Sequence, residues 1–201
     1  ILPNGSFYSP FNPRQGENFE PNPGFHEGSA WNYTFYVPHD IPGLTKLMGG
    51  KKPFIDKLQS VFDEGLYDPA NEPDIAYPYL FSQKEVNRLL KKYFKNQPDG
   101  IPGNDDTGTM SAWAVFSMMG FYPDCPGLPR YTLTSPLFDR ITIHLDPKYY
   151  KQKEIIIETE RPSSAAIFID RVDQNDKKIK GYFITHDELT QNGPIKFILK
   201  K

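Results

Sequence analysis

The stretch from Pro98 to Pro123, PDGIPGNDDTGTMSAWAVFSMMGFYP, constrains the fold of this chain more than any other. Its first half is a polar loop in which Asn104, Asp105 and Asp106 are consecutive. Its second half, residues 110–119, is almost uninterruptedly apolar and long enough for about three helical turns. Neighbouring carboxylates repel one another and resist burial, so their position at the start of an apolar helix requires an explanation.

Helix capping is one explanation for this loop. An Asp or Asn before an apolar run accepts hydrogen bonds from the free backbone N–H groups and is favoured by the helix dipole. One cap needs only one such side chain, however, and this loop carries several in succession. The spacing alone therefore leaves both capping and a chemical role open.

Apolar spacing predicts two further helices earlier in the chain. The apolar residues recur with helical spacing between Gly50 and Gly65 and again over residues 86–94. The side chains on these two faces are Phe54, Ile55, Leu58, Val61 and Phe62, and Val86, Leu89, Leu90, Tyr93 and Phe94. The helix predicted over 107–119 is apolar nearly all round, so we expect structure beyond these helices to cover it.

After Pro123 the sequence changes to short β-like runs. A turn-rich junction, residues 123–129, precedes them. Ile141, Ile143 and Leu145 alternate with polar residues, which is the period of a half-buried strand. The predicted strands are 131–134, 140–145, 154–158, 165–172, 179–185 and 195–199. Helices followed by strands predict an α+β fold or two adjoining domains.

Composition excludes several classes of function. The net charge of −2 gives no basic surface for nucleic acid, and no apolar run is long enough to span a membrane. The single cysteine, Cys125, excludes an internal disulfide and a cysteine-based metal cluster. The chain begins without an initiator Met or a signal-peptide pattern, so we expect an internal start, either of a mature product or of a fragment.

Two polar clusters precede the predicted helices. Glu27 has Trp31 and Tyr33 close by in sequence, and a carboxyl group in apolar surroundings keeps its proton as a general acid must. A solvated Glu in a loop is the alternative. Asp40 is expected to cap a helix that begins near Ile41, and His39 beside it is either a ligand, a substrate contact or structural.

A third polar cluster, NEPD at residues 71–74, gathers three oxygen-bearing side chains around a proline. Such density suits a hard cation like Ca²⁺, and it suits an ordinary turn equally well. The chain has no EF-hand spacing, nucleophile elbow, phosphate loop or His-rich zinc pattern. What remains is carboxylate chemistry, and two separated carboxyl groups, one acid and one base, define glycoside hydrolysis.

Four ordered segments together resemble glycoside hydrolase family 92, the calcium-dependent exo-acting α-mannosidases. They are FHEGSAWNYTFYVPHDIPGLTKLMGG (25–50), NEPDIAYPYLF (71–81), PDGIPGNDDTGTMSAWAVFSMMGFYPDCPG (98–127) and YFITHDELTQNGPIKFIL (182–199). The resemblance covers most of the chain. Three departures from the family lie near the third cluster: the stretch from Phe62 to Asn71 is short, the loop expected over residues 81–86 is missing, and Ala76 stands where relatives often carry His.

The resemblance implies a fold that this chain would share only in part. Family members have an N-terminal β-sandwich, an (α/α)6 barrel and a C-terminal sheet layer. Residues 1–123 would be the terminal helices of the barrel, and residues 124–201 an antiparallel β-sheet or sandwich region. The N-terminal domain and the remaining barrel helices, which the site would need, would lie outside this chain.

The resemblance also implies roles for individual residues. Glu27 corresponds to the general acid, and Asp105 and Asp106 to the acidic pair from which the general base comes. Asn71 and Glu72 correspond to the Ca²⁺-holding segment, and Trp31 and His39 to the surroundings of the sugar. The mechanism would be inversion, which needs acid and base carboxyls roughly 6.5–9.5 Å apart to admit a water.

We therefore expect the C-terminal portion of an inverting, Ca²⁺-dependent exo-α-mannosidase with an α-1,2 preference. Its partners would be the mannosyl ends of N-glycans or mannan, and its location periplasmic or extracellular, as in the family. The isolated portion is expected to be inactive, because a partial barrel does not shape a sugar pocket. The alternative is a non-catalytic carbohydrate-binding or structural module.

Overall fold

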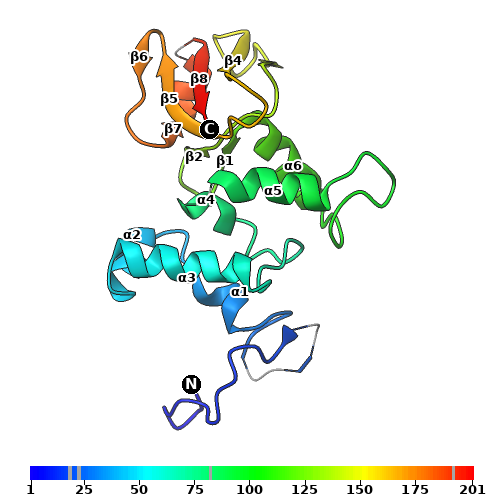
Figure 1. Ribbon diagram of the computed structural model, residues 1–201, viewed down its shortest axis with the longest axis vertical. Coiled ribbons are helices and arrows are strands. Elements are labelled where there is room, and N and C mark those ends of the chain that lie inside the picture. Colours follow the sequence, from blue (N-terminus) through cyan, green and yellow to red (C-terminus); the bar gives the residue numbers. More distant parts are fainter. Residues whose placement is uncertain (18–19, 22–23, 82, 192) are drawn as a thin grey trace. The chain divides into compact units, whose positions relative to one another are not determined.

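The computed structural model describes residues 1–17, 20–21, 24–81, 83–191 and 193–201 of the chain. These residues form two compact units, Ile1–Asp74 and Ile75–Lys201 (Figure 1). The boundary predicted at residue 123 concerns the barrel and β regions of a complete catalytic domain, and it stays a prediction.

The first unit contains three helices after an irregular segment. They are α1 (Ala30–Thr34), α2 (Ile41–Leu47) and α3 (Lys51–Asp63). α2 begins where the sequence predicted, since the Asp40 carboxylate accepts a hydrogen bond from the Gly43 N–H at 2.8 Å. α3 buries the predicted apolar face through Phe54, Leu58, Val61 and Phe62.

Aromatic contacts build the core of the first unit. Phe35, which follows α1, meets Phe54 of α3 edge to face, with ring centroids 5.1 Å apart. Phe62 at the end of α3 contacts Tyr67 in the following loop at 5.0 Å. All of these side chains are buried. The core thus fixes both the α1 region and the loop after α3, and these two segments carry the candidate site.

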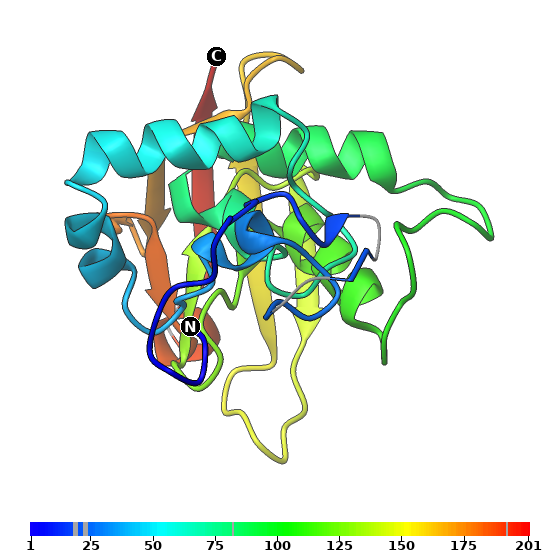
Figure 2. The same cartoon turned by 90° about the horizontal axis from the view of Figure 1, so that it is seen from below.

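The helices of the second unit are α4 (Tyr77–Phe81), α5 (Gln83–Tyr93) and α6 (Thr109–Met119). α5 buries Val86, Leu89 and Leu90, which confirms the predicted face. Trp113 of α6 is buried and donates its indole N–H to the Ile75 carbonyl at 2.8 Å. The loop of residues 94–108 joins α5 to α6 (green in Figure 2).

The start of α6 differs from the prediction. The sequence predicted a helix from residue 107, but α6 begins at Thr109. Asp106, Thr107 and Gly108 have φ angles of 41°, 58° and 89°, in the left-handed region that a right-handed helix excludes. The outer face of α6 exposes Val115 at 49%, consistent with an apolar helix that this chain covers only in part.

The strands of the second unit form two sheets. The first sheet has the order β1–β2–β7, with β1 at Phe121–Tyr122, β2 at Arg130–Leu133 and β7 at Phe183–Thr185. The second has the order β3–β4–β8–β5–β6, with bounds Arg140–His144, Glu154–Glu160, Ile195–Lys200, Phe168–Gln174 and Lys177–Lys178. The α+β class is confirmed.

Three details of the β region differ from the prediction. The β region is not purely antiparallel, because β4 and β8 pair in parallel, which the long connection through β5 and β7 permits. The strand predicted over 179–185 is confirmed only in part, since β7 begins at Phe183 and Gly181 before it has φ 81°. The helix α7 (His186–Gln191) was not predicted.

A capping box marks the start of α7. Glu188 accepts hydrogen bonds from the backbone N–H and the hydroxyl of Thr185, and its own N–H donates to that hydroxyl. The sequence Thr185-His-Asp-Glu188 has the S/T-x-x-E pattern that identifies such a start. This signal was available in the sequence.

One hydrophobic core joins strands of both sheets. Its buried members include Leu133, Ile157, Ile184, Ile195 and Phe197. Ile141, Ile143 and Leu145 are partly buried against it, which confirms the alternation predicted for β3. Among the described residues, no helix has the length and apolar character required to cross a bilayer.

Gly120 provides a test of this packing. Its φ is 89°, and a Cβ there would lie 2.6 Å from the Pro136 Cγ and 2.9 Å from the Pro136 backbone nitrogen. Gly181 has a similar φ of 81°, but a Cβ there meets nothing within 4 Å. We predict that Gly120→Ala lowers the free energy of unfolding by about 1–3 kcal/mol more than Gly181→Ala, because only the first adds a clash. Denaturant unfolding measures both, and equal losses would contradict this packing.

Candidate active site

Glu27 lies in the turn that leads into α1. Its φ of 52° is in the left-handed region, which is uncommon for a residue other than glycine and often marks functional sites. Its side chain is 64% exposed, and one carboxylate oxygen lies 3.6 Å from the His26 Nε2. The described part of this chain thus leaves the carboxylate in water, rather than among the aromatic rings that the sequence suggested.

Two hydrogen-bonded loops meet beside Glu27. The Asn32 amide, at the start of α1, donates through Nδ2 to the Oδ2 of the Asp74 carboxyl group at 2.8 Å. The Asn32 Oδ1 accepts from the Ser29 backbone N–H at 2.7 Å. Asn71 donates through Nδ2 to the Glu27 carbonyl oxygen at 2.8 Å. Residues 27–32 are therefore held directly by residues 71–74.

Gly28 shows how closely these loops approach. A Cβ at this position would lie 2.8 Å from the Asn71 Nδ2 and 2.9 Å from the Asn32 Oδ1. Real Cβ atoms do not approach other atoms so closely. A Cβ at this position, immediately after Glu27, would therefore displace the amide groups of Asn71 and Asn32.

Asp74 is the most deeply buried carboxyl group of the site. Its relative exposure is 0%, and burial raises its pKa to about 8. Hydrogen bonds from the Asp68 backbone N–H and the Asn32 amide oppose this rise in pKa, and the nearby Asp68 carboxylate adds to it. Both hydrogen bonds go to Oδ2, while Oδ1 is buried without a hydrogen-bond partner among the described residues.

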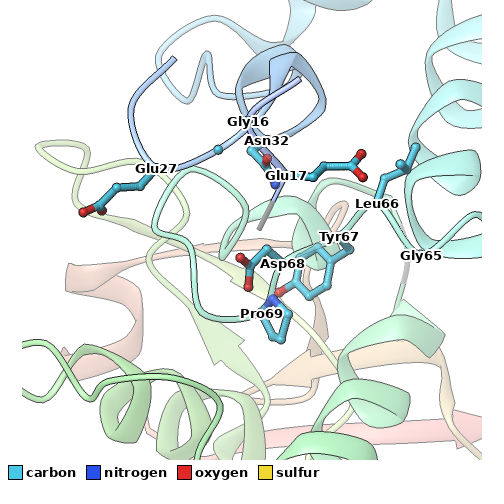
Figure 3. A pocket seen from close by; sticks show the side chains of 10 residues that line it. Gly16, Glu17, Glu27, Asn32, Gly65, Leu66, Tyr67, Asp68 and Pro69 are labelled. Carbon is cyan, nitrogen blue, oxygen red and sulfur yellow. The ribbon is translucent and has the colours of Figure 1, made fainter. Parts of the chain in front are cut away.

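A polar cavity of about 320 Å³ lies between residues 27–32 and the loop of residues 65–69. Its lining includes Glu17, Glu27 and Asp68, together with Asn32 and Tyr67. Figure 3 shows Glu27 at the edge, with its carboxylate turned away from Asn32 and Asp68. Carboxylates and amides in a cavity of this size are suited to the hydroxyl groups of a sugar.

The other predicted site residues of the first unit are close in sequence to residues that line this cavity, but they differ in their contacts. Trp31 is partly buried in α1, and the Lys57 ammonium lies 5.2 Å from the centre of its ring. His39 is exposed in the turn before α2. Glu72 is exposed in the turn that Asn71 begins. The structure brings Glu27 and Asn71 together through the hydrogen bond from the Asn71 amide to the Glu27 carbonyl oxygen.

Asp105 and Asp106 lie in the second unit and have different environments. The Asp105 carboxylate accepts from the backbone N–H and the hydroxyl of Ser111, both at 2.8 Å, so it caps α6. These hydrogen bonds lower the pKa of Asp105, and the bond from the Ser111 backbone N–H has the larger effect. Asp106 is exposed, and its backbone carbonyl, not its carboxylate, accepts from Thr109. Capping therefore accounts for Asp105 and leaves the Asp106 carboxylate directed to solvent.

The residues that the structure describes offer few ligands for a metal ion. Among the residues that the structure describes, no three His, Cys, Asp or Glu side chains are grouped as a metal site. The Asn71 amide and the Glu72 carboxylate are the hard oxygen donors that Ca²⁺ takes. Because Asn71 uses its nitrogen on the Glu27 carbonyl, its oxygen is the end suited to a cation. These two residues fit part of a calcium site.

Sequence reasoning missed Asn32 and the connecting role of Asp74. Asp74 belongs to the NEPD cluster, but its partner lies 42 residues away. Hydrophobic spacing carries no signal for such a pair. The only hint was the density of polar side chains in each segment.

The chain belongs to glycosyl hydrolase family 92. The model of this family's catalytic domain matches residues 2–201. An "uncharacterized secreted glycosidase" of Arthroderma benhamiae is 27% identical over 186 residues, which cover 88% of this chain and 24% of that protein.

Solved structures of the same family share this fold. A family GH92 inverting mannosidase from Bacteroides thetaiotaomicron matches with a TM-score of 0.85 and 29% identity, over 98% of this chain and 30% of that one. A family GH92 α-mannosidase from the same organism matches with a TM-score of 0.85 and 28% identity, over 98% and 27%. The chain thus spans less than a third of the length of these relatives.

The capping role of Asp105 predicts a specific dependence of stability on pH. Its pKa in the folded chain lies below the ordinary value of 3.8, so its contribution is fully present above that value and is lost as the pH falls through the folded-state pKa. We predict that wild type is more stable than Asp105→Asn at pH 7 and that the difference shrinks below about pH 4. Denaturant unfolding at several pH values measures this.

Asp99→Asn is the matched control, because Asp99 is an exposed aspartate of the same loop. Its difference from wild type should stay small across the range. If wild type and Asp105→Asn lose stability in parallel down to pH 2, the charge of Asp105 does not support α6.

Proposed function

We propose that this chain carries the catalytic carboxylates of an inverting exo-α-mannosidase. The observation that supports this most is the family match over residues 2–201, together with two mannosidase structures at 28–29% identity. Both Glu27 and the Asp105–Asp106 pair lie in described loops of this chain. The substrates would be the mannosyl ends of N-glycans or mannan, with α-1,2 linkages preferred.

Glu27 is assigned as the general acid. Its exposed carboxyl group, at the edge of a polar cavity, is available to protonate the leaving oxygen of a glycoside. The left-handed turn at Glu27 and the hydrogen bond to its carbonyl oxygen fix the backbone of Glu27 and thereby the direction of its Cα–Cβ bond. Trp31 and His39 are assigned to the surroundings of the sugar.

Asp106 is assigned as the general base and Asp105 as its support. A base must accept a proton from the attacking water, and a carboxylate already engaged by two hydrogen bonds with a lowered pKa does so less readily. Asp105 instead holds the start of α6 and with it the backbone of its neighbour. The water attacks the sugar on the face opposite the leaving oxygen, which gives inversion.

Asn71 and Glu72 are proposed to contribute oxygen ligands to Ca²⁺. Bound there, the ion would supply charge that polarises sugar hydroxyls and favours a distorted ring. The remaining ligands would be water, substrate or protein outside this chain, because Ca²⁺ takes six to eight oxygens. Within this chain, the work of Asn71 is also to hold the Glu27 backbone.

The activity is proposed to need more protein than this chain. The chain spans less than a third of its relatives, and Val115 of α6 is half exposed where a complete (α/α)6 barrel would cover it. An N-terminal domain and the other barrel helices would complete the pocket, so the chain alone is expected to be inactive. By analogy with the secreted relative, the location would be periplasmic or extracellular.

Leaving-group dependence tests the acid and base assignments. In a protein of the relatives' length that carries this chain, we predict that Glu27→Gln lowers kcat/KM on α-linked mannobiose by about 10²–10⁴-fold. Activity on a dinitrophenyl α-mannoside should change little, because that phenolate leaves without protonation. Asp106→Asn should lower both activities, since water attacks in both reactions. Initial rates on the two substrates measure this.

Asp105→Asn is the control for Asp106→Asn, because an Asn at this position still has an oxygen that can cap α6. It should keep more activity than Asp106→Asn. If Asp105→Asn loses more activity than Asp106→Asn, the roles of the two aspartates are exchanged. If Glu27→Gln loses equal activity on both substrates, Glu27 is not the general acid. No mannose release by wild type would favour the non-catalytic module.

Metal removal tests the calcium assignment. In the same protein, we predict that a chelator abolishes mannose release and that added Ca²⁺ restores it. Glu72→Gln should raise the Ca²⁺ concentration for half-maximal activity by about tenfold or more, because it removes a charged ligand. Glu64→Gln, at an exposed glutamate just after α3, is the control. Activity that survives the chelator would contradict a calcium role.

A further inference from the structure

We infer that Asn32 and Asp74 are positioning residues that aim Glu27 for proton transfer through a buried hydrogen bond between the two loops. This inference rests on the proposed role of Glu27 as the general acid. Neither residue is expected to touch the substrate's leaving oxygen. Their effect would pass through Ser29 and the backbone that follows Glu27.

Glu27 needs such support because its own side chain has little. The side chain is 64% exposed, and its backbone has a φ of 52°, which a non-glycine residue adopts only when its surroundings hold it there. An exposed side chain on a strained turn samples several directions. A general acid, in contrast, must reach within about 3 Å of the atom it protonates.

The described contacts hold this turn from both sides. On one side, Asn71 donates to the Glu27 carbonyl at 2.8 Å. On the other, the Asn32 Oδ1 accepts from the Ser29 N–H at 2.7 Å and from the Ser29 hydroxyl at 3.1 Å. The peptide of Gly28 lies between the two amide side chains, with no space for a Cβ. The backbone after Glu27 is therefore fixed by two amides.

Asp74 fixes the amide of Asn32 in turn. The Asp74 Oδ2 accepts from the Asn32 Nδ2 at 2.8 Å and from the Asp68 N–H at 2.9 Å. Asn32 presents its oxygen to Ser29 only when its nitrogen faces Asp74, so one contact determines the other. The segment after α3 is thereby connected to the turn at Glu27.

The cost of this arrangement indicates a geometric role. Asp74 is fully buried, and its Oδ1 has no hydrogen-bond partner among the described residues, which destabilises the fold. An apolar pair of similar size would fill the space without this penalty. It would not, however, present an acceptor to the Ser29 N–H. The polar pair is thus explained by what it orients.

A comparison of two substrates tests this inference. In a protein of the relatives' length, Asn32→Leu should lower kcat/KM on α-linked mannobiose by about 10–100-fold, because a small displacement of a catalytic group has effects of this size. Activity on a dinitrophenyl α-mannoside, which needs no acid, should change by less than about threefold. Asp74→Leu should show the same split.

Asp74→Asn tests the geometry with a conservative change. An Asn at this position keeps an oxygen that accepts from both Asn32 and the Asp68 N–H, so mannobiose activity should remain within about threefold of wild type. If the leucine variants do not fold, Asn32→Asp takes their place. It keeps the acceptor for Ser29, loses the donor to Asp74, and should still affect mannobiose more strongly.

Asn87→Leu is the matched control, because Asn87 in α5 is as buried as Asn32, at 5% exposure. It should affect the two substrates equally. Equal losses on both substrates for a folded Asn32 or Asp74 variant would overturn the positioning role. If wild type releases mannose from neither substrate, the proposed function itself fails, which is a separate outcome.

Discussion

The hydrogen bond between the Asn32 amide and the buried Asp74 carboxyl group is the constraint on which the first unit's candidate site depends. It joins the start of α1 to the turn after α3, and through Ser29 it fixes the backbone that follows Glu27. The aromatic core around Phe54 and Phe62 brings these two segments into the same unit. Packing brings the two loops together, and the Asn32–Asp74 hydrogen bond fixes their relative position.

The second unit also contains a strained loop that a polar side chain stabilises. Its loop also passes through the left-handed region, at Asp106 and Thr107, just before α6. The Asp105 carboxylate accepts from the backbone N–H and the hydroxyl of Ser111 in that helix and thus holds the strained backbone beside it. In both units, a candidate catalytic carboxylate lies on a strained turn that neighbouring polar side chains stabilise. Such strain persists only where the surroundings determine it.

How much the sequence could predict depends on the range of the interactions. The cap of α2, the buried face of α3 and the alternation in β3 depend on residues close together in sequence, so they were predictable. The parallel pairing of β4 with β8 and the Asn32–Asp74 pair join residues about 40 positions apart, and spacing carries no signal for them. The family resemblance indicated the role of Glu27, and the structure showed the hydrogen bonds that hold its backbone.

We propose that this chain carries the acid and base of an inverting α-mannosidase. The most direct test is the anomeric configuration of the first mannose released from an α-mannoside by a protein of the relatives' length, followed by proton NMR before mutarotation. An acid and a base on opposite faces of the sugar predict β-mannose as the first product. α-Mannose as the first product would mean retention and would contradict the assignment of a water-activating Asp.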